Sequence, residues 1–162
     1  ADLIIISGER HDDSFDLITR TLEKMGEIKT VEISIESSGR HNFGTIGPDK
    51  TPVVTLPGDP IAAYISFELL IRPMIRTMLG TATIHRPSVK AKLEKALTSS
   101  GGYRSYVRAI LSEDGKSVAP LSSQDEQATL SDANCFIAVP EGETSLSAGA
   151  QVNVVVLERR YL

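Results

Sequence analysis

The chain has 162 residues, of which 41% are hydrophobic and 23% are charged, and Cys135 is its single cysteine. This balance is typical of a globular protein and excludes a mainly disordered chain, and one cysteine excludes a disulfide scaffold. No apolar run approaches the ~20 residues that a membrane-spanning helix needs, and no basic-then-apolar leader opens the sequence. We therefore expect a cytoplasmic protein with no membrane partner.

The net charge of −4 comes entirely from the first half of the chain. Residues 1–80 carry 8 Lys and Arg against 12 Asp and Glu, whereas residues 81–162 carry 9 of each kind. An acidic balance without a basic run or a tryptophan is unfavourable for a nucleic-acid groove. We therefore expect no nucleic-acid partner.

The first 80 residues begin with the pattern of an α/β unit. The continuous apolar run at residues 3–6 is typical of a strand that is buried on both faces, as in a parallel sheet flanked by helices. A buried strand that begins so early also suggests a piece of a longer protein. Ser14 can cap the helix that follows, and Gly26 can end it. The apolar positions of this helix are Leu17, Ile18, Leu22 and Met25.

Two more strands and a long helix complete the first half. Spaced apolar residues predict a strand over residues 28–35, and after a polar loop residues 52–56 predict another. Asp59 and Pro60 are typical of a helix start, with Asp at the cap and Pro at the first helical position. We expect this helix to bend at Pro73.

Beyond residue 84 the pattern changes to short strands separated by turns. Residues 81–87 form a polar connection, so we expect one domain over residues 1–84 and a second over residues 85–162. Short strands at this spacing predict a small all-β barrel or sandwich. The expected strands cover residues 89–97, 103–111, 118–121, 135–139 and 152–157.

The segment from Ser7 to Asp16 is the first candidate site. It follows a buried strand and leads into a helix, where open α/β sheets usually bind ligands. Asp12, Asp13 and Asp16 could offer oxygen ligands to a hard cation such as Mg²⁺. Alternatively, these carboxylates only complement the positive end of the helix dipole.

Residues 56–60, with the sequence LPGDP, form the second candidate site. Pro57 and Pro60 restrict the backbone, and Gly58 would allow a ligand to approach it. Such a corner at a helix start suits an anion. Asp59, however, places a negative charge there, and the alternative is a rigid strand-to-helix turn without a ligand.

Other motifs are weak. His11, His41 and His85 have no spacing that suggests zinc, and neither a glycine-rich phosphate loop nor a GxSxG motif is present. Cys135 lies in an apolar run, which predicts a buried thiol.

Taken in order, these features resemble the carboxyl half of the MoeA-type molybdopterin molybdenumtransferases, the family that includes the E domain of gephyrin. Ser7 and Gly8 followed by Asp16 resemble the family's SGG-x-S-x-G-x-x-D, and residues 56–60 resemble its LPGNP. The resemblance continues through the segments FEL at 67–69, RP at 72–73, RP at 86–87, GYR at 102–104, VRA at 107–109, AN at 133–134, VPEG at 139–142 and AG at 148–149.

This resemblance implies a fold and an activity. Residues 1–84 would be part of a three-layer molybdopterin-binding domain with a parallel-type sheet, and residues 85–162 a small β-barrel domain. Full-length members insert molybdate into molybdopterin, in its adenylylated form, in a Mg²⁺-dependent step, and they act as homodimers. Asp16 would be the catalytic residue and would hold Mg²⁺ or molybdate. The implied substrate-binding residues are Ser7, Gly8, Pro57, Gly58, Asp59 and Pro60.

Three glutamates depart from the family's pattern and leave the activity open. Glu9 stands where the family has a second glycine, and Glu32 and Glu36 stand where it has two lysines. One charge at ~4 Å is worth about 4 kcal/mol at an effective dielectric near 20, so these changes oppose anion binding. Arg40 could replace one lost lysine. The alternative to a transferase is a divergent, non-catalytic paralogue or scaffold that keeps the fold.

Overall fold

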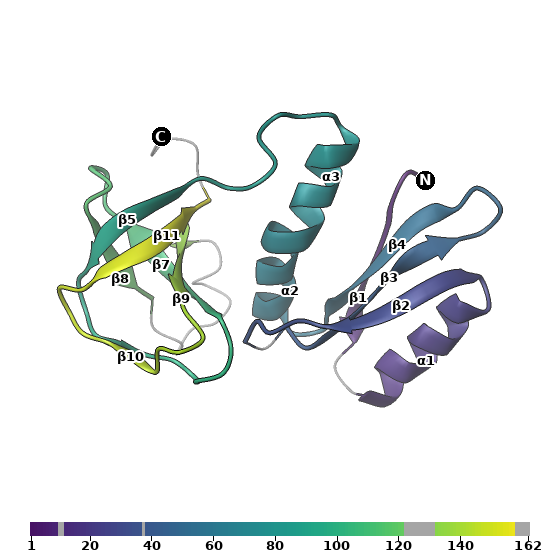
Figure 1. Ribbon diagram of the computed structural model, residues 1–162, viewed down its shortest axis with the longest axis horizontal. Coiled ribbons are helices and arrows are strands. Elements are labelled where there is room, and N and C mark those ends of the chain that lie inside the picture. Colours follow the sequence, from purple (N-terminus) through teal and green to yellow (C-terminus); the bar gives the residue numbers. More distant parts are fainter. Residues whose placement is uncertain (10–11, 37, 122–131, 158–162) are drawn as a thin grey trace. The chain divides into compact units, whose positions relative to one another are not determined.

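A four-stranded sheet and a closed barrel are the two main β structures of the chain (Figure 1). The computed structural model describes residues 1–9, 12–36, 38–121 and 132–157. Contacts divide the chain into a first unit, residues 1–84, and a second unit, residues 85–162. None of the described helices has the length and apolar character that crossing a membrane would require.

The sheet of the first unit has the strand order β1–β4–β3–β2 and is mixed. β1 (Ile4–Glu9) is parallel to β4 (Thr51–Pro57), whereas β3 (Arg40–Ile46) is antiparallel to both β4 and β2 (Gly26–Glu32). Parallel neighbours need a crossover of a dozen or more residues, so the short turn at residues 47–50 permits only antiparallel pairing. The predicted parallel-type sheet is therefore wrong for two of the three strand pairs.

β3 is a strand where the sequence predicted a polar loop. His41 and Asn42, both fully buried, lie within it, so two of its buried side chains are polar. Gly44 allows close pairing, because a Cβ there would lie 2.0 Å from the carbonyl oxygen of Glu27 on β2. Such a strand lacks the alternation of apolar residues by which strands are found.

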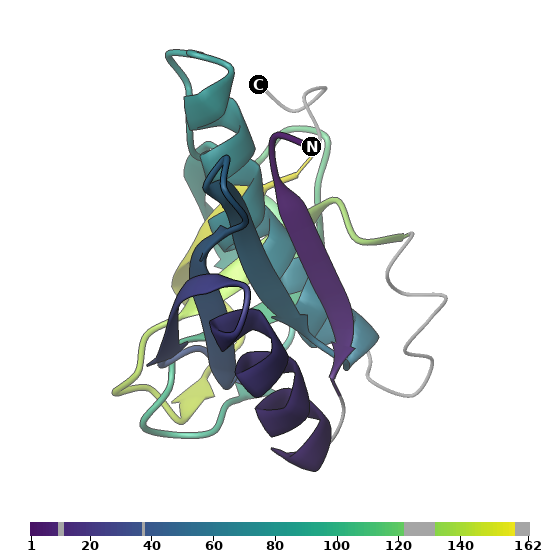
Figure 2. The ribbon, with the colours of Figure 1, turned by 90° about the vertical axis from the view of Figure 1, so that its right-hand side faces the viewer.

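Helices cover both faces of this sheet (Figure 1, Figure 2). Leu22 of the first helix packs with Val53 of β4, and Ile71 of the second helical segment packs with Val54. Because consecutive residues of a strand point to opposite faces, the two helical segments lie on opposite sides of the sheet.

α1 (Asp12–Glu23) begins earlier than the sequence predicted. Ser14 lies inside the helix rather than at its cap, and Gly26 belongs to β2. Leu22 is buried as expected, but Leu17 is exposed. The predicted cap was wrong because the helix already includes the two aspartates before Ser14, and acidic residues are favoured in the first turn of a helix.

The second helical segment is continuous but changes its winding. α2 (Pro60–Ser66) is followed by a π-helical turn, η1 (Phe67–Ile71), and then by α3 (Arg72–Met78). Pro73 cannot donate a hydrogen bond to the preceding turn, and its ring crowds that turn. The predicted disturbance at Pro73 therefore takes the form of a wider turn just before it.

The second unit contains a closed barrel with the strand order β11–β5–β8–β7–β9, so the predicted small β-barrel is confirmed. A short ribbon of β6 (Leu97–Thr98) and β10 (Ser145–Leu146) accompanies it. The barrel strands are β5 (Ser88–Leu93), β7 (Ser105–Leu111), β8 (Ser117–Pro120), β9 (Cys135–Val139) and β11 (Gln151–Val156).

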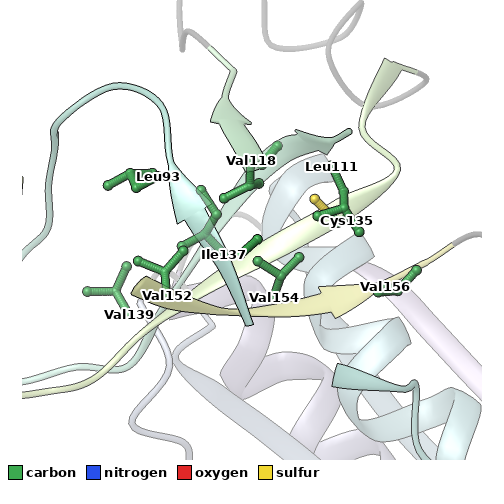
Figure 3. Packing of buried hydrophobic residues seen from close by; sticks show 11 residues of the cluster. Leu93, Leu111, Val118, Cys135, Ile137, Val139, Val152, Val154 and Val156 are labelled. Atoms are coloured by element: carbon green, nitrogen blue, oxygen red, sulfur yellow. The ribbon is translucent and has the colours of Figure 1, made fainter. Parts of the chain in front are cut away.

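Aliphatic side chains form the core of the second unit (Figure 3). Along β11, Val152, Val154 and Val156 are all buried in this core, as the period of two in a strand requires. Cys135 lies among these residues and is fully buried, and this desolvation raises the pKa of its thiol to about 12. The predicted buried thiol is confirmed, and it is unreactive at neutral pH because only a thiolate is a good nucleophile.

Candidate functional site

Two of the predicted motifs lie side by side at one end of the sheet. β1 and β4 are parallel neighbours, and Glu9 is the partner of Pro57 in their register. Ile6 is the partner of Thr55, so three steps along β1 match two steps along β4. This register shift is a β-bulge or a similar irregularity, and it lies directly beside the 57–60 corner. Bulges of this kind are common next to active sites.

Asp59 has a structural role at the corner. Its Oδ1 accepts a hydrogen bond from the backbone N–H of Ala62 at 2.8 Å, and Pro60 occupies the start of α2. Asp59 is therefore the N-cap of the helix, a role that requires no ligand. Pro57 and Gly58 are half-buried, whereas Asp59 and Pro60 are exposed.

Asp16 forms an ion pair with Arg40 at the start of β3. Arg40 Nη1 donates to Asp16 Oδ1 at 3.4 Å, and the guanidinium carbon of Arg40 lies 4.3 Å from the centroid of the Phe15 ring. Because α1 begins at Asp12, Asp16 lies beyond the first turn, where interaction with the helix dipole fades. The two charged side chains are 50% and 38% exposed, so this pair contributes at most about 1 kcal/mol to stability.

The described residues do not fit a magnesium site. No group of three or more His, Cys, Asp or Glu side chains comes together among them. Asp16 faces a guanidinium, which repels a divalent cation. The side chains of Asp12 and Asp13 lie outside what the structure describes, as does the whole of His11.

The three glutamates that depart from the family's pattern differ in their surroundings. Glu32 ends β2, is exposed and is the direct partner of Arg40 in the β2–β3 register. Side chains of such partners start about 5 Å apart, so Glu32 adds a negative charge next to Arg40. Glu36 is half-buried. The side chain of Glu9 lies outside the described residues.

A buried polar network centred on His41 supports the same end of the sheet. His41 Nδ1 lies 2.8 Å from the carbonyl oxygen of Thr55, and its Nε2 lies 2.9 Å from Ser38 Oγ. Ser38 Oγ lies 2.8 Å from Ser66 Oγ at the end of α2. All four residues are buried. No local pattern in the sequence indicates this network, because its members come from three separate segments of the chain.

The protonation of this network follows from the donors and acceptors. A carbonyl oxygen can only accept, so His41 Nδ1 carries the proton and donates to Thr55. In the neutral imidazole Nε2 must then accept from the Ser38 hydroxyl, and Ser66 must donate to Ser38 Oγ. Burial without a charged partner lowers the pKa of His41, and this outweighs the opposing effect of the backbone groups of Thr55 and Ser38.

A second set of hydrogen bonds, centred on Asn42, fastens α1 to the sheet. The backbone N–H of Asn42 donates to Thr55 Oγ1 at 2.9 Å, and Asn42 Nδ2 donates to Thr19 Oγ1 of α1 at 2.8 Å. Thr30 Oγ1 of β2 donates to Asn42 Oδ1 at 2.7 Å. Because Thr19 lies one turn after Asp16, these bonds also position the Asp16–Arg40 pair.

Comparison with known proteins identifies the relatives of this chain. Residues 90–157 match the family described as MoeA C-terminal region (domain IV). Molybdopterin molybdenumtransferase 1 of Mycobacterium tuberculosis is 31% identical over 166 residues, which cover 97% of this chain and 39% of that protein. Molybdopterin molybdenumtransferase 2 of the same organism is 32% identical over 95% of this chain and 40% of its own length. The chain belongs to the MoeA-type family.

Solved structures of MoeA-type proteins have the same fold. The molybdopterin biosynthesis protein MoeA from Pyrococcus horikosii superimposes with a TM-score of 0.79 at 28% identity, over 98% of this chain and 38% of that one. A molybdenum cofactor biosynthesis protein from Pyrococcus furiosus, at 20% identity and a TM-score of 0.69, shows the fold alone over 95% of this chain and 66% of that one. The chain spans about two fifths of the length of the two M. tuberculosis relatives.

The cap at Asp59 yields a prediction about stability. Asp59→Asn should leave the melting temperature nearly unchanged, because Asn caps a helix as well as Asp does. Asp59→Ala should lower the free energy of unfolding by about 0.5–2 kcal/mol. Thermal unfolding followed by circular dichroism compares the two variants. Equal stability of the Ala variant and the wild type would contradict the capping role.

The lowered pKa of His41 predicts that the first unit is less stable in acid. The unfolded state takes up a proton near the ordinary pKa of 6.5, whereas the folded state resists it until a lower pH. The contribution of His41 is therefore complete above pH 6.5 and is lost as the pH falls through the lower folded pKa. Urea unfolding at several pH values between about 5 and 8 measures this loss.

A matched control for this prediction is His85→Gln, which removes an exposed histidine. This variant should keep the loss of stability in acid, whereas His41→Gln should reduce it. Equal pH dependence in the wild type and His41→Gln would show that another group is responsible.

Proposed function

We propose that this chain is the part of a molybdopterin molybdenumtransferase that binds the anionic groups of molybdopterin and molybdate. The observation that carries the proposal is the pairing of Glu9 with Pro57. It brings two motifs, about fifty residues apart in sequence, to the same carboxyl edge of a sheet flanked by helices. Ligands of open α/β sheets collect at this edge. The names of the M. tuberculosis relatives supply the chemistry.

Backbone groups would provide the hydrogen bonds to the anion. The register shift between Ile6 and Glu9 interrupts the regular ladder of β1 and β4, and a backbone N–H at this interruption would donate to a phosphate oxygen. The exposed Ser7 adds a hydroxyl donor. Gly8 and Gly58 would let the anion approach the backbone. Pro57 and Pro60 hold the corner rigid.

Arg40 would supply the positive charge that, according to the resemblance, lysines supply in other members of the family. Its guanidinium is held over the Phe15 ring and next to Asp16, and its side chain is 38% exposed. An anion that binds Arg40 competes with the Asp16 carboxylate for the same donor. We retain the assignment of Asp16 as the catalytic residue as a proposal that follows from the family resemblance.

The finer properties of the whole protein are also proposals. Residues 1–84 would form part of a three-layer molybdopterin-binding domain, and residues 85–162 the β-barrel domain. The complete protein would act in the cytoplasm as a homodimer on molybdopterin or its adenylylated form. A requirement for Mg²⁺ follows from the resemblance only, and we assign no described residue to the ion.

A non-catalytic paralogue or scaffold is the second candidate function. The position of Glu32 opposite Arg40 favours it, because the carboxylate partly neutralises the cation available to the substrate. This alternative predicts that the full-length protein forms no molybdenum cofactor from molybdopterin and molybdate.

Reversing the acidic charges tests the proposed binding site. The double variant Glu32→Lys, Glu36→Lys of the full-length protein should bind molybdopterin more tightly than the wild type. Its affinity should also depend more steeply on salt, because exposed charges are screened. Isothermal titration calorimetry at low and high salt measures both effects.

Glu27→Lys is the matched control for this experiment. Glu27 is exposed on the same strand, β2, but lies near the opposite end from Glu32. The control should leave the affinity nearly unchanged. If the control strengthened binding as the double variant does, the effect would be a general attraction between a more positive protein and the anion. If the double variant had no effect on the affinity, the anion would bind elsewhere.

Asp16→Asn tests the proposed catalytic residue. Since its ion pair is half-exposed, the substitution should change the free energy of unfolding by no more than about 1 kcal/mol. Formation of molybdenum cofactor by the full-length protein should nevertheless be lost. Retained activity, or lost stability with intact molybdate binding, would show that Asp16 is structural.

A further inference from the structure

The pairing of β3 with β4 stops short of the candidate site. The backbone register between them runs from Ile46, opposite Thr51, to Phe43, opposite Val54. Beyond this point β3 continues to pair with β2 as far as Arg40. β4 loses its backbone partner on the β3 side at Thr55, two residues before the 57–60 corner.

Side chains replace the missing backbone ladder. The carbonyl oxygen of Thr55 accepts from His41 Nδ1 at 2.8 Å, and Thr55 Oγ1 accepts from the backbone N–H of Asn42 at 2.9 Å. In a regular antiparallel ladder the backbone groups would bond to each other directly. The His41 side chain thus supplies a hydrogen bond between β3 and β4 at the point where their backbone ladder ends.

The same ring connects to the two segments that surround the corner. Through Ser38 it reaches the loop that leads into Arg40, and through Ser66 it reaches the end of the helix that begins at the corner. His41 is itself the neighbour of Arg40 in the chain. A displacement of the imidazole would therefore move the cation and the corner relative to each other.

We propose that His41, with Ser38 and Ser66, positions Arg40 relative to the 57–60 corner, so that the guanidinium and the backbone donors address the same anion. This proposal rests on the proposed function. His41 is a positioning residue, because with no exposed surface it cannot touch a ligand. Both ring nitrogens of His41 form hydrogen bonds, one as donor and one as acceptor. The donated protons all point in one direction, from Ser66 to Ser38, to His41 and to Thr55.

Variants of His41 test the proposal in the full-length protein. His41→Phe keeps a ring but removes both hydrogen bonds, whereas His41→Asn can keep the donor to Thr55. His41→Phe should weaken molybdopterin binding about tenfold or more, because a small misplacement of a binding group can cost as much as ~10²-fold. His41→Asn should recover part of this loss. Circular dichroism at the temperature of measurement confirms that each variant is folded.

Ser66→Ala and Ser99→Ala form a matched pair of variants. They keep the proposal testable even if His41→Phe does not fold. Each removes one serine hydroxyl from a close hydroxyl pair, at 2.8 Å with Ser38 in the first unit and at 2.6 Å with Ser105 in the second. Both should lower stability, but only Ser66→Ala should weaken molybdopterin binding. Equal affinities for Ser66→Ala, Ser99→Ala and the wild type would overturn the proposal.

Nuclear magnetic resonance gives a readout that needs no ligand. In the wild type the His41 imidazole should carry its proton on Nδ1, and His41→Phe should shift the signals of the Arg40 side chain and the Gly58 amide. A proton on Nε2, or unchanged Arg40 and Gly58 signals, would overturn the positioning role. If these signals behave as expected while the wild type binds neither molybdopterin nor molybdate, the proposed function fails and the positioning role stands.

Discussion

The end of β4 depends on one buried imidazole. Thr55 has left the backbone ladder of β3, and its carbonyl would be an unsatisfied acceptor in a water-free environment without His41. Such a group costs about 1–3 kcal/mol, so the position is sensitive to any change of the ring. The backbone pairing of the two strands ends shortly before the chain turns into the 57–60 corner. The candidate site is therefore built on a polar support rather than on an apolar one.

This support explains why β3 contains polar residues at positions that an ordinary strand fills with apolar ones. A hydrophobic residue in place of His41 could pack, but it could not satisfy Thr55 or orient Ser38. Buried polar networks specify one arrangement when every member is satisfied, and each hydrogen bond named here has both a donor and an acceptor. Rigidity at this end would suit the proposed site, whose donors would have to meet a small, highly charged anion.

The charged residues around the candidate site differ from those that the family resemblance implies. The resemblance implies lysines at the positions of Glu32 and Glu36, and in the proposed site Arg40 would restore part of that positive charge from an adjacent strand. The guanidinium is held on one side by the Phe15 ring and on another by Asp16. A planar, permanently charged guanidinium in place of flexible ammonium groups also changes how an oxyanion can be held, because it can donate two parallel hydrogen bonds. The proposed site would therefore keep a cation, Arg40, which already forms an ion pair with Asp16.

Local patterns in the sequence determined much of the architecture. The turn signals and branched residues of the second half predicted a small all-β barrel or sandwich, and the apolar run of Cys135 predicted its burial, because these features depend on short-range periodicity. The LPGDP segment predicted the start of α2 for the same reason, since proline geometry and capping act within a few residues. Tertiary structure alone decided that residues 40–46 form a strand, that the sheet is mixed, and that Asp16 meets Arg40. It also assembled Ser38, His41, Thr55 and Ser66, whose hydrogen bonds join separate segments and leave no periodic signal in any one of them.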